Sequence, residues 1–425
     1  MQNALFSSLP HPAKPAVLPD FVQRRVDRFY TERVAEAWGG RHILRGRQPG
    51  ADALLLNNND YLGITRHPRI VQAQTHALAA HGNGAMMSGL FLQQDDDPMH
   101  QLEAKFASAL GFEASVLCQS GFNANVGLVQ AIAGERTPVY IDLIAHTSLW
   151  EGIKSAGAQA VPILHNDADY LERQILRHGP GVVLVDSVYS TNGSLCLLHE
   201  FIEVAERSGC VMVVDESHSL GTHGRLGEGL VASLGLSKRV HFVTASLAKA
   251  YCSRAGLIAC DKRFAQYFGF ESLPAIFSST LLPHEIAALD AAHEVIRSEG
   301  WRRDRLHAVT RRLRQALTEL RYPIADGSEQ IIALEAGTEA NTMRLRDALE
   351  ARGVFGAIFC APATAKNRAL VRLTLHAELS DADVERIIEA CRQVRDVIDV
   401  SEWAASRRQQ RPTQRRSAPL LEAVA

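Results

Sequence analysis

The sequence predicts an α/β protein with a large, doubly wound and mostly parallel β-sheet and a smaller α+β domain toward the C-terminus. Short continuous apolar runs at residues 181–186, 211–214 and 240–243 are typical of parallel strands that are buried on both faces. Stretches with the period of a helix alternate with such runs. Polar residues follow the last two runs directly. Because ligands in such sheets bind outside the carboxyl ends of the strands, we expect a site there.

Two of these polar residues indicate a cofactor. Asp215 follows the second run, and Lys249 lies beyond the third. An acid at a strand end can keep a pyridine nitrogen protonated, which turns the ring into an electron sink. A lysine there can form a Schiff base with an aldehyde once its neighbours lower its pKa. Either residue alone has a plainer interpretation, as a turn or cap residue or as a solvated amine. The pair predicts a pyridoxal 5′-phosphate (PLP) site.

Two segments carry a family resemblance. The segments DESHS, which starts at Asp215, and SLAK, which ends at Lys249, resemble the signatures of the α-oxoamine synthases. This family has fold type I of the PLP-dependent transferases and condenses an amino acid with an acyl-CoA. The resemblance covers roughly residues 20–400. It implies that Lys249 carries the cofactor and acts as the base, that Asp215 holds the ring nitrogen and that His218 hydrogen-bonds the ring oxygen.

Composition sets the class and the expected compartment. The 425 residues are 46% hydrophobic and have a net charge of −2, so we expect a sizeable core and more than one domain. The charge does not favour nucleic-acid binding. No apolar run has the length of a membrane span or the pattern of a secretion signal, so we expect a cytoplasmic protein without a membrane partner. Seven scattered cysteines without a Cys-x-x-Cys motif favour reduced thiols, and we expect no bound metal.

The chain is expected to fall into four segments. Residues 1–60 form an N-terminal arm and a helix, residues 61–300 the PLP-binding domain, and residues 301–400 the small α+β domain. Residues 401–425 contain five arginines and two prolines with few large apolar side chains, and we expect a disordered basic tail. A regulatory or nucleic-acid contact of this tail stays open.

Further residues are expected around the cofactor. A turn at Ser120, Gly121 and Phe122 follows a predicted strand at 114–118 and begins a helix. Backbone N–H groups at a helix N-terminus bind phosphate, although a simple serine cap explains the same pattern. The family resemblance favours the phosphate, and it implies that the imidazole of His146 stacks on the cofactor ring. It also places two serines near the cofactor, Ser190 and Ser246.

The resemblance also indicates residues for the substrate and for a second subunit. Asn59 lies in a segment, NNNDYLG, that matches a family signature near the substrate. Arg372 matches the strand arginine that binds the amino-acid carboxylate, a role that suits its permanent charge and forked shape; an arginine at a sheet edge is the simpler interpretation. Ser278 and Ser279 match a segment that reaches the phosphate of the neighbouring subunit. This implies a homodimer with shared active sites, and an ordinary Ser/Thr turn is the alternative.

Several departures from the family are shared with one branch, the α-hydroxyketone quorum-sensing autoinducer synthases of the cholera-autoinducer type. Ser187 stands where most relatives have Glu and Met99 where they have His. Met86 and Met87 lie in a Gly-rich loop, residues 82–89, that carries an Arg in most relatives. The extended matches to this branch lie at 91–99, 121–128, 145–152, 185–191, 215–224 and 275–283.

The branch resemblance implies the reaction. An amino acid of the S-adenosylmethionine or 2-aminobutyrate type would join a medium-chain acyl-CoA, CoA and CO₂ would leave, and the product would be an amino-ketone precursor of the signal. Met86 and Met87 favour an aliphatic acyl chain, although both could simply belong to the core. The alternative enzyme is an 8-amino-7-oxononanoate synthase or another α-oxoamine synthase. The non-enzyme alternative is an inactive regulatory subunit with the PLP fold.

Overall fold

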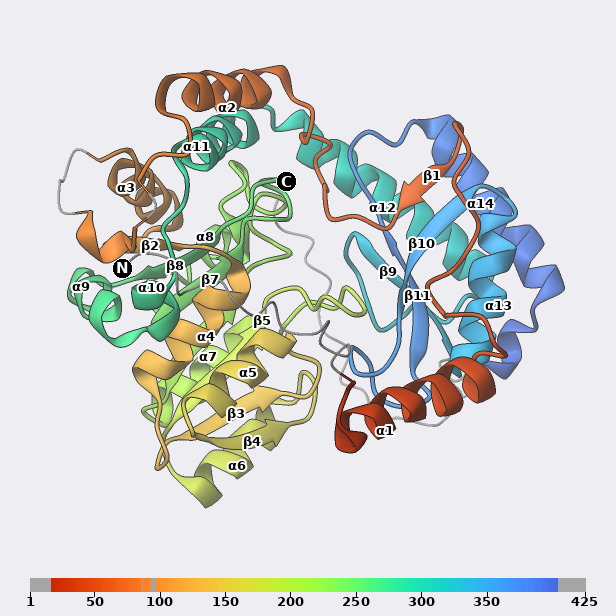
Figure 1. Ribbon diagram of the computed structural model, residues 1–425, viewed down its shortest axis with the longest axis horizontal. Helices are drawn as coiled ribbons and strands as arrows, with labels where there is room; N and C mark the ends of the chain where they lie inside the picture. The colour runs from red at the N-terminus through yellow and green to blue at the C-terminus, as the bar shows by residue number, and fades with distance from the viewer. Residues whose placement is uncertain (1–16, 86, 93–96, 404–425) are drawn as a thin grey trace, which may run out of the picture.

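The computed structural model describes residues 17–85, 87–92 and 97–403. Residues 1–16 of the predicted arm, the loop residue Met86 and residues 404–425 of the predicted tail lie outside this part of the chain. The described residues form a larger domain around a seven-stranded sheet and a smaller domain around a four-stranded sheet (Figure 1). The predicted α/β fold with a mostly parallel sheet is confirmed.

The sheet of the larger domain has the strand order β2-β8-β7-β6-β5-β3-β4. All neighbouring strands are parallel except β8, which runs antiparallel to both β2 and β7. The edge strand β4 contains Pro162, a residue that central strands exclude because it cannot donate a ladder hydrogen bond. The strands are β2 Ala114–Cys118, β3 Pro138–Asp142, β4 Gln159–Ile163, β5 Val182–Asp186, β6 Val211–Asp215, β7 Phe242–Ser246 and β8 Gly256–Cys260.

Helices bury both faces of this sheet. Val182 and Leu184 of β5 belong to one apolar cluster, with α4, α5 and α9, while Val183 and Val185 belong to another, with α3, α6 and α7. This two-sided burial explains why the strand is a continuous apolar run rather than an alternating one. The helices of this domain are α2 Pro68–His81, η2 Gly89–Phe91, α3 Pro98–Leu110, α4 Gly121–Ile132, α5 Thr147–Ser155, α6 Ala168–His178, α7 Leu198–Arg207, α8 Gly229–Ser233, α9 Lys262–Glu271, α10 Leu273–Phe277 and α11 Pro283–Ser298.

The smaller domain contains a mixed sheet of order β1-β10-β11-β9. The strand β11 is antiparallel to both β10 and β9, and β1 pairs with β10 in parallel. The strand β1 comes from the N-terminal segment, so that segment contributes to the smaller domain. The elements are β1 Leu54–Leu56, α12 Trp301–Glu319, β9 Ile331–Gly337, α13 Glu339–Glu350, β10 Val354–Phe359, β11 Ala369–Thr374, α14 Asp381–Val397 and η3 Val400–Glu402.

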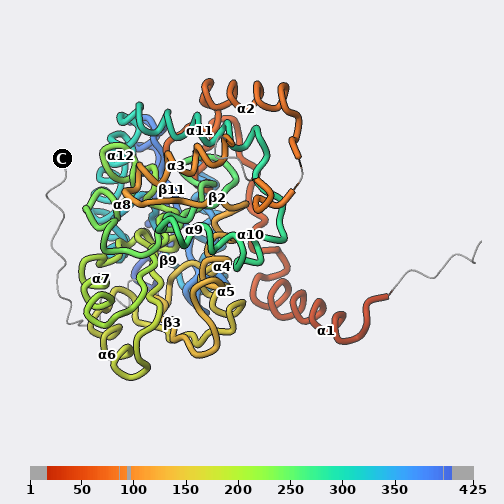
Figure 2. The backbone as a smooth tube through the Cα atoms, turned by 90° about the vertical axis from the view of Figure 1, so that its left-hand side faces the viewer, coloured from red at the N-terminus to blue at the C-terminus, as the bar shows by residue number. Residues whose placement is uncertain are grey.

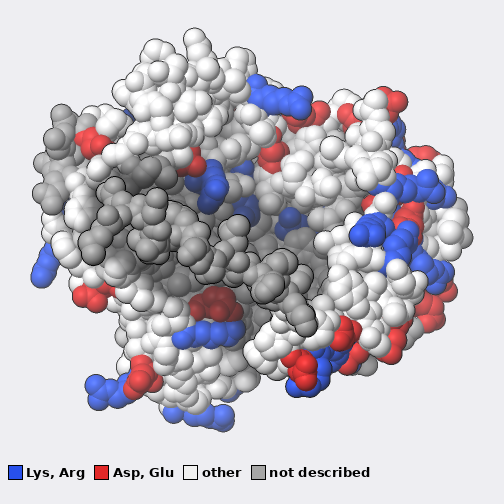
Figure 3. Space-filling model, in the orientation of Figure 1, with Lys and Arg blue, Asp and Glu red and all other residues white. Residues whose placement is uncertain are grey.

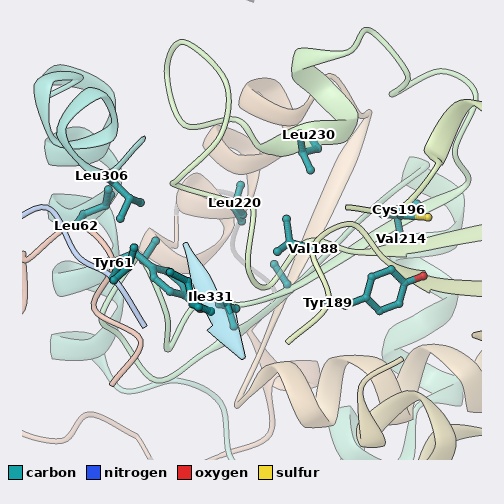
Figure 4. Packing of buried hydrophobic residues seen from close by; sticks show 14 of the residues in the cluster. Tyr61, Leu62, Val188, Tyr189, Cys196, Val214, Leu220, Leu230, Leu306 and Ile331 are labelled. Atoms are coloured by element: carbon teal, nitrogen blue, oxygen red, sulfur yellow. The ribbon is translucent and has the colours of Figure 1, made fainter. Parts of the chain in front are cut away.

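One apolar cluster joins the two domains. It contains Val214 of β6 in the larger domain, Leu306 of α12 and Ile331 of β9 in the smaller domain, and Tyr61 in the segment between them (Figure 4). Each of these side chains is almost fully buried. Because close-packed apolar contacts resist sliding, this cluster fixes the strand that carries Arg372 relative to the strand that carries Asp215.

Four local features differ from the sequence expectation or add to it. The predicted strand at 240–243 runs from Phe242 to Ser246, and the helical stretch after Pro283 is two helices, α11 and α12. At the N-terminus, α1 (Asp20–Arg28) continues into the π-helical η1 (Phe29–Ala37), and α1 projects from the body of the molecule without a buried residue (Figure 2). At the other end, Trp403 is buried, beyond the expected start of the tail.

None of the described helices has the length and hydrophobicity of a membrane span.

Candidate active site

Asp215, the last residue of β6, begins a chain of buried hydrogen bonds. Its Oδ2 accepts a hydrogen bond from Nδ2 of Asn125 at 2.7 Å, and its Oδ1 accepts one from the backbone N–H of Ser217 at 2.8 Å. Nδ2 of Asn125 also donates to Oγ of Ser148 at 2.8 Å, and that oxygen lies 2.7 Å from Nδ1 of His146. The chain therefore joins Asp215 to His146, two residues that the sequence predicted at one site.

His146 is held in place from two sides. It is the N-cap of α5, where its Nδ1 accepts a hydrogen bond from the backbone N–H of Ser148, and its own backbone N–H donates to Oδ1 of Asp186 at 3.2 Å. Burial lowers the pKa of His146, which favours a neutral ring. Burial, and then repulsion from Asp215, raises the pKa of Asp186 well above its ordinary value. The imidazole plane is thus fixed beside Asp215.

Lys249 lies in the turn after β7 and is half-buried. Burial lowers the pKa of its ammonium group; the charge of Asp215 opposes this effect and the charge of Arg372 reinforces it. The three predicted residues come from β6, the turn after β7 and the smaller domain, and the influence of Asp215 and Arg372 on Lys249 indicates that the fold brings them near one another. A lowered pKa increases the fraction of neutral amine, the form that reacts with an aldehyde.

The turn between β2 and α4 packs against the ends of β7 and β8. A Cβ atom on Gly121 would lie 2.5 Å from Cβ of Ser246, and one on Gly256 would lie 2.2 Å from the carbonyl oxygen of Ser120. Only glycine fits at these two positions. Oγ of Ser120 accepts a hydrogen bond from the backbone N–H of Asn123 at 3.1 Å, so the predicted serine cap is present. Gly121 and Phe122 begin α4, and the Phe122 side chain is exposed.

His218 is buried beside Tyr61. Nδ1 of His218 and the Tyr61 hydroxyl are 2.5 Å apart. Burial raises the pKa of Tyr61, so the phenol keeps its proton, and burial together with the charges of Lys249 and Arg372 lowers the pKa of His218 well below its usual range. A phenol that donates to Nδ1 of a neutral imidazole leaves the proton on Nε2. His218 can therefore donate a hydrogen bond from Nε2.

Arg372 of β11 reaches across from the smaller domain. Its NH1 group donates to the carbonyl oxygen of Ser190 at 2.9 Å, and its NH2 group donates to Oδ1 of Asn59 at 3.0 Å. The guanidinium lies 4.4 Å from the centre of the Phe359 ring. Nε of Arg372 is buried and has no hydrogen-bond partner within the described part of the chain. The structure therefore brings together Arg372, Asn59 and Ser190, and these two contacts use two of the five N–H donors of the guanidinium.

A second buried network supports the loop that carries Ser190. Asp142, at the end of β3, is fully buried, and its Oδ2 accepts a hydrogen bond from the Tyr189 hydroxyl at 2.9 Å and lies 3.0 Å from Nδ1 of His165. Nε2 of His165 lies 2.9 Å from Oγ of Ser194. Because Tyr189 directly precedes Ser190, this network fixes the carbonyl oxygen that Arg372 contacts.

Ser278 and Ser279 lie outside these networks. They follow α10, and the carbonyl oxygen of Ser279 accepts a hydrogen bond from Nε2 of Gln119 at 2.8 Å. Gln119 directly precedes Ser120, so the backbone of this segment lies beside the turn of its own chain.

The residues at this site fit PLP. The Asp215 carboxylate is fixed where the parallel strands end and can face a protonated ring nitrogen. The turn at Gly121 has no space for side chains but presents the N-terminus of α4, which favours an anion. Nε of Arg372 is a buried donor that still lacks an acceptor. Figure 3 shows basic side chains in the hollow between the two domains.

Asn125 and Tyr61 are functional candidates that the sequence analysis did not single out. A signal for Asn125 was present, because residues 121, 124, 125 and 128 lie on one face of a helix and this face is otherwise small or apolar. A polar residue on such a face needs a buried partner. Tyr61 had no comparable signal, since a tyrosine beside a turn packs into the core as readily as it lines a site.

Comparison with known proteins identifies the family. The model of the family Aminotransferase class I and II matches residues 51–391. A CAI-1 autoinducer synthase of Vibrio campbellii is 44% identical over 380 residues, which are 89% of this chain and 96% of that protein. An 8-amino-7-oxononanoate synthase of Symbiobacterium thermophilum is 31% identical over 351 residues, covering 81% of this chain and 89% of that protein.

Solved structures show the same fold. A serine palmitoyltransferase from S. paucimobilis, with bound PLP-myriocin, has a TM-score of 0.79 at 21% identity and covers 90% of this chain and 98% of that one. An 8-amino-7-oxononanoate synthase from Francisella tularensis has a TM-score of 0.71 at 19% identity, with coverages of 81% and 98%. The chain therefore belongs to the aminotransferase class I and II family and, within it, to the α-oxoamine synthases, which are PLP-dependent acyltransferases.

Proposed function

We propose that the protein condenses an amino acid of the S-adenosylmethionine or 2-aminobutyrate type with a medium-chain acyl-CoA, with loss of CoA and CO₂. The product is the amino-ketone precursor of a quorum-sensing autoinducer. One observation carries the reaction: NH1 of Arg372 in the smaller domain donates a hydrogen bond to the carbonyl oxygen of Ser190, which follows β5 at the same edge of the sheet where β6 ends in Asp215. The product class is supported by the 44% identity to the CAI-1 autoinducer synthase over nearly the whole length of both proteins.

PLP, when bound, supplies an aldehyde that links to amines and a ring that withdraws electrons from the amino-acid Cα. Asp215 holds the proton at the ring nitrogen, and Asn125 and Ser217 keep its carboxylate oriented for this. The backbone N–H groups of Gly121 and Phe122 bind the phosphate, since the cap of Ser120 uses only the next N–H along the helix.

Lys249 moves the proton at Cα. A general base works best when its pKa lies near the pH of the medium, and burial shifts the pKa of Lys249 downward, in that direction. His146, which Ser148 and Asp186 hold in place, would stack its ring on the cofactor ring. His218 donates a hydrogen bond from Nε2 to the ring oxygen, which its bond to the Tyr61 hydroxyl favours.

Arg372 binds the carboxylate of the amino acid. A guanidinium has five N–H donors, and the contacts to Ser190 and Asn59 use only two of them. Because the group is almost fully buried, its attraction to a carboxylate is screened less than it would be in water. Asn59 and Ser190 therefore orient the arginine without neutralising it.

The alternative enzyme is an 8-amino-7-oxononanoate synthase, which the 31% identical relative supports. Met99 and Ser187 count against it, because most α-oxoamine synthases have His and Glu at these positions. Met99 is buried, and its Sδ accepts a hydrogen bond from Thr280 at 3.2 Å. The inactive regulatory subunit is disfavoured by the assembly of Lys249, Asp215 and His218 at one site.

Mass spectrometry of the products tests the proposal. Incubation with 2-aminobutyrate and acyl-CoAs of about eight to twelve carbons should yield amino ketones whose masses show loss of CoA and CO₂. With S-adenosylmethionine as the amino donor, methylthioadenosine should leave as well. Lys249→Ala should form none of them, since it lacks the amine that reacts with PLP. Preferred formation of 8-amino-7-oxononanoate from a pimeloyl donor and alanine would establish the alternative enzyme instead.

Asn125→Leu should weaken PLP binding. The substitution removes one hydrogen bond to the Asp215 carboxylate, worth about 1.5–3 kcal/mol, so we expect about 10- to 100-fold weaker binding of PLP in absorbance titrations of the apoprotein. Gln130→Leu is the matched control, because Gln130 lies on the same helix and its amide contacts only Ser155 at the surface. Equal PLP affinity in Asn125→Leu and Gln130→Leu would exclude this role of Asn125.

The loop with Met87 is placed to affect the acyl chain. The carbonyl oxygen of Met87 accepts a hydrogen bond from the backbone N–H of Thr280 at 2.8 Å, and Ser88 forms a β-bridge with Ser279. The loop thus lies beside the segment that we assign to the cofactor phosphate of a second subunit. Methionine is flexible and apolar, which suits an aliphatic chain, and each methylene that it helps to bury contributes about 0.8 kcal/mol.

Met87→Arg should shift the acyl preference. We expect the ratio of kcat/KM for decanoyl-CoA to that for succinyl-CoA to fall about tenfold or more, because the charge disfavours an apolar chain and attracts a carboxylate. Leu176→Arg on α6, where the leucine is 83% exposed, is the control and should leave the ratio unchanged. An unchanged ratio in Met87→Arg would show that this loop does not set the preference.

We also propose a homodimer with shared active sites. Around Ser278 and Ser279, the structure leaves large apolar side chains of η2, α9 and α10 at the surface, and these elements contact one another. The exposed side chains are Phe91, Phe270, Leu273 and Phe277. A contiguous apolar surface of this kind is typical of an interface, and a second subunit would cover it.

Complementation tests this arrangement. Ser279→Asp would repel the phosphate in the partner's site, and Lys249→Ala inactivates its own site. Mixed after unfolding and refolding, the two inactive variants should regain about one quarter of the wild-type activity, since half of the dimers then hold one intact site out of two. No recovery, with heterodimers shown by native mass spectrometry, would mean that each site is made by a single chain.

A further inference from the structure

Three residues that the proposed mechanism does not use meet between the two domains. His223 follows the turn that carries His218, His307 lies on α12 and Glu329 precedes β9. Nε2 of His223 lies 2.9 Å from Oε2 of Glu329, and the two imidazole rings are 5.2 Å apart at their centres. One nitrogen or oxygen atom from each residue lies within 4.8 Å of the other two.

The surroundings fix the tautomer of His307. Its Nε2 lies 2.8 Å from the carbonyl oxygen of Thr222. A carbonyl oxygen only accepts hydrogen bonds, so Nε2 carries the proton and Nδ1 keeps its lone pair. In the neutral ring, Nδ1 is then the nitrogen that can bind a metal ion. Histidines that ligate metals commonly donate their other ring N–H to a backbone carbonyl in this way.

Glu329 is an anionic donor in the same place. Its Oε2 lies 2.9 Å from Nε2 of His223, and a hydrogen bond from that nitrogen stabilises the carboxylate form. Nε of Arg314 donates to the backbone carbonyl oxygen of Glu329 rather than to its carboxylate. One carboxylate oxygen contacts Ser328 and the other contacts His223, and neither contact is a full charge pair with a lysine or arginine.

We propose that His223, His307 and Glu329 bind one divalent transition-metal ion of the zinc type. Two imidazoles and one carboxylate are a donor set that Zn²⁺ accepts, with a fourth position left for water. The side chains of His223 and Glu329 are 10% and 13% exposed, so solvent can reach the site. The ion replaces the proton between Nε2 of His223 and Oε2 of Glu329, and this proton leaves to solvent.

The ion would brace the turn that carries His218 against the smaller domain. Nε2 of Gln330, the residue after Glu329, donates to the carbonyl oxygen of His218 at 2.8 Å, and Oγ1 of Thr222 donates to the same oxygen at 3.1 Å. A metal ion bound by His223, Glu329 and His307 of α12 would therefore hold together the turn and the smaller domain on the two sides of this carbonyl oxygen. Within the described part of the chain, none of the three ligands hydrogen-bonds to a residue assigned to PLP, so the ion would act on the site through the position of this turn.

Zinc binding by the holoenzyme tests the proposal. Protein treated with EDTA and then dialysed against micromolar Zn²⁺ should retain one zinc per chain by elemental mass spectrometry, and zinc should raise its melting temperature. Glu329→Gln and His307→Gln should bind zinc at least about tenfold more weakly and lose the thermal shift. Glu329→Gln keeps the shape of the side chain and its contact with His223, and circular dichroism shows whether it is folded.

The pair of His67 and Glu299 provides a matched control. Nε2 of His67 lies 3.0 Å from Oε1 of Glu299, a His–Glu contact that resembles the one at His223 but lacks a second imidazole. His67→Gln should leave zinc retention and the thermal shift unchanged. The proposal would be overturned if the wild-type protein retained no zinc. It would also be overturned if wild type, Glu329→Gln and His307→Gln retained equal amounts, which is the result expected when only the free cysteines hold the zinc.

Discussion

The burial of the Asp215 carboxylate is the constraint on which the larger domain depends. A carboxylate removed from water costs several kcal/mol unless hydrogen bonds and an opposite charge compensate for it. Asn125 and Ser217 supply the hydrogen bonds. This requirement explains why α4 places an asparagine on its buried face. It also explains why the turn before α4 is close enough to β7 and β8 that two positions accept only glycine.

The second constraint is the shared core of the two domains. Arg372 has to reach a site that is built on β6 and β7, although its own strand belongs to another sheet. The apolar cluster that includes Val214, Leu306 and Ile331 sets the position of the two sheets, and the hydrogen bond from Arg372 to Ser190 crosses the remaining gap. The network at Asp142 fixes Tyr189, and with it the carbonyl oxygen of Ser190. Substrate positioning therefore begins in packing far from the reacting atoms.

The sequence predicted the features that leave a local pattern. Continuous apolar runs predicted the strands, and polar residues at their ends located Asp215 and Lys249, because the fold places strand ends at the site. Features made by long-range contacts left no such pattern. The three residues of β1 could not reveal their pairing with β10. Tyr61 and Asp142 have partners that only the folded chain brings near. The same holds for His223, His307 and Glu329, which only the folded chain brings near one another. The scattered cysteines, without a Cys-x-x-Cys motif, predicted no metal.

The two ends of the site differ in charge. Arg372 keeps its charge when it is buried, because even a lowered pKa of a guanidinium lies far above neutral. Its field, added to burial, lowers the pKa values of Lys249 and His218. The site thus has one permanent cation where the substrate carboxylate is expected and two groups that tend toward their neutral forms where protons are expected to move. Replacing Arg372 by a neutral residue would remove the carboxylate partner and raise the proton affinity of the base as well. In the proposed reaction, substrate binding and proton transfer are therefore coupled through a single buried charge.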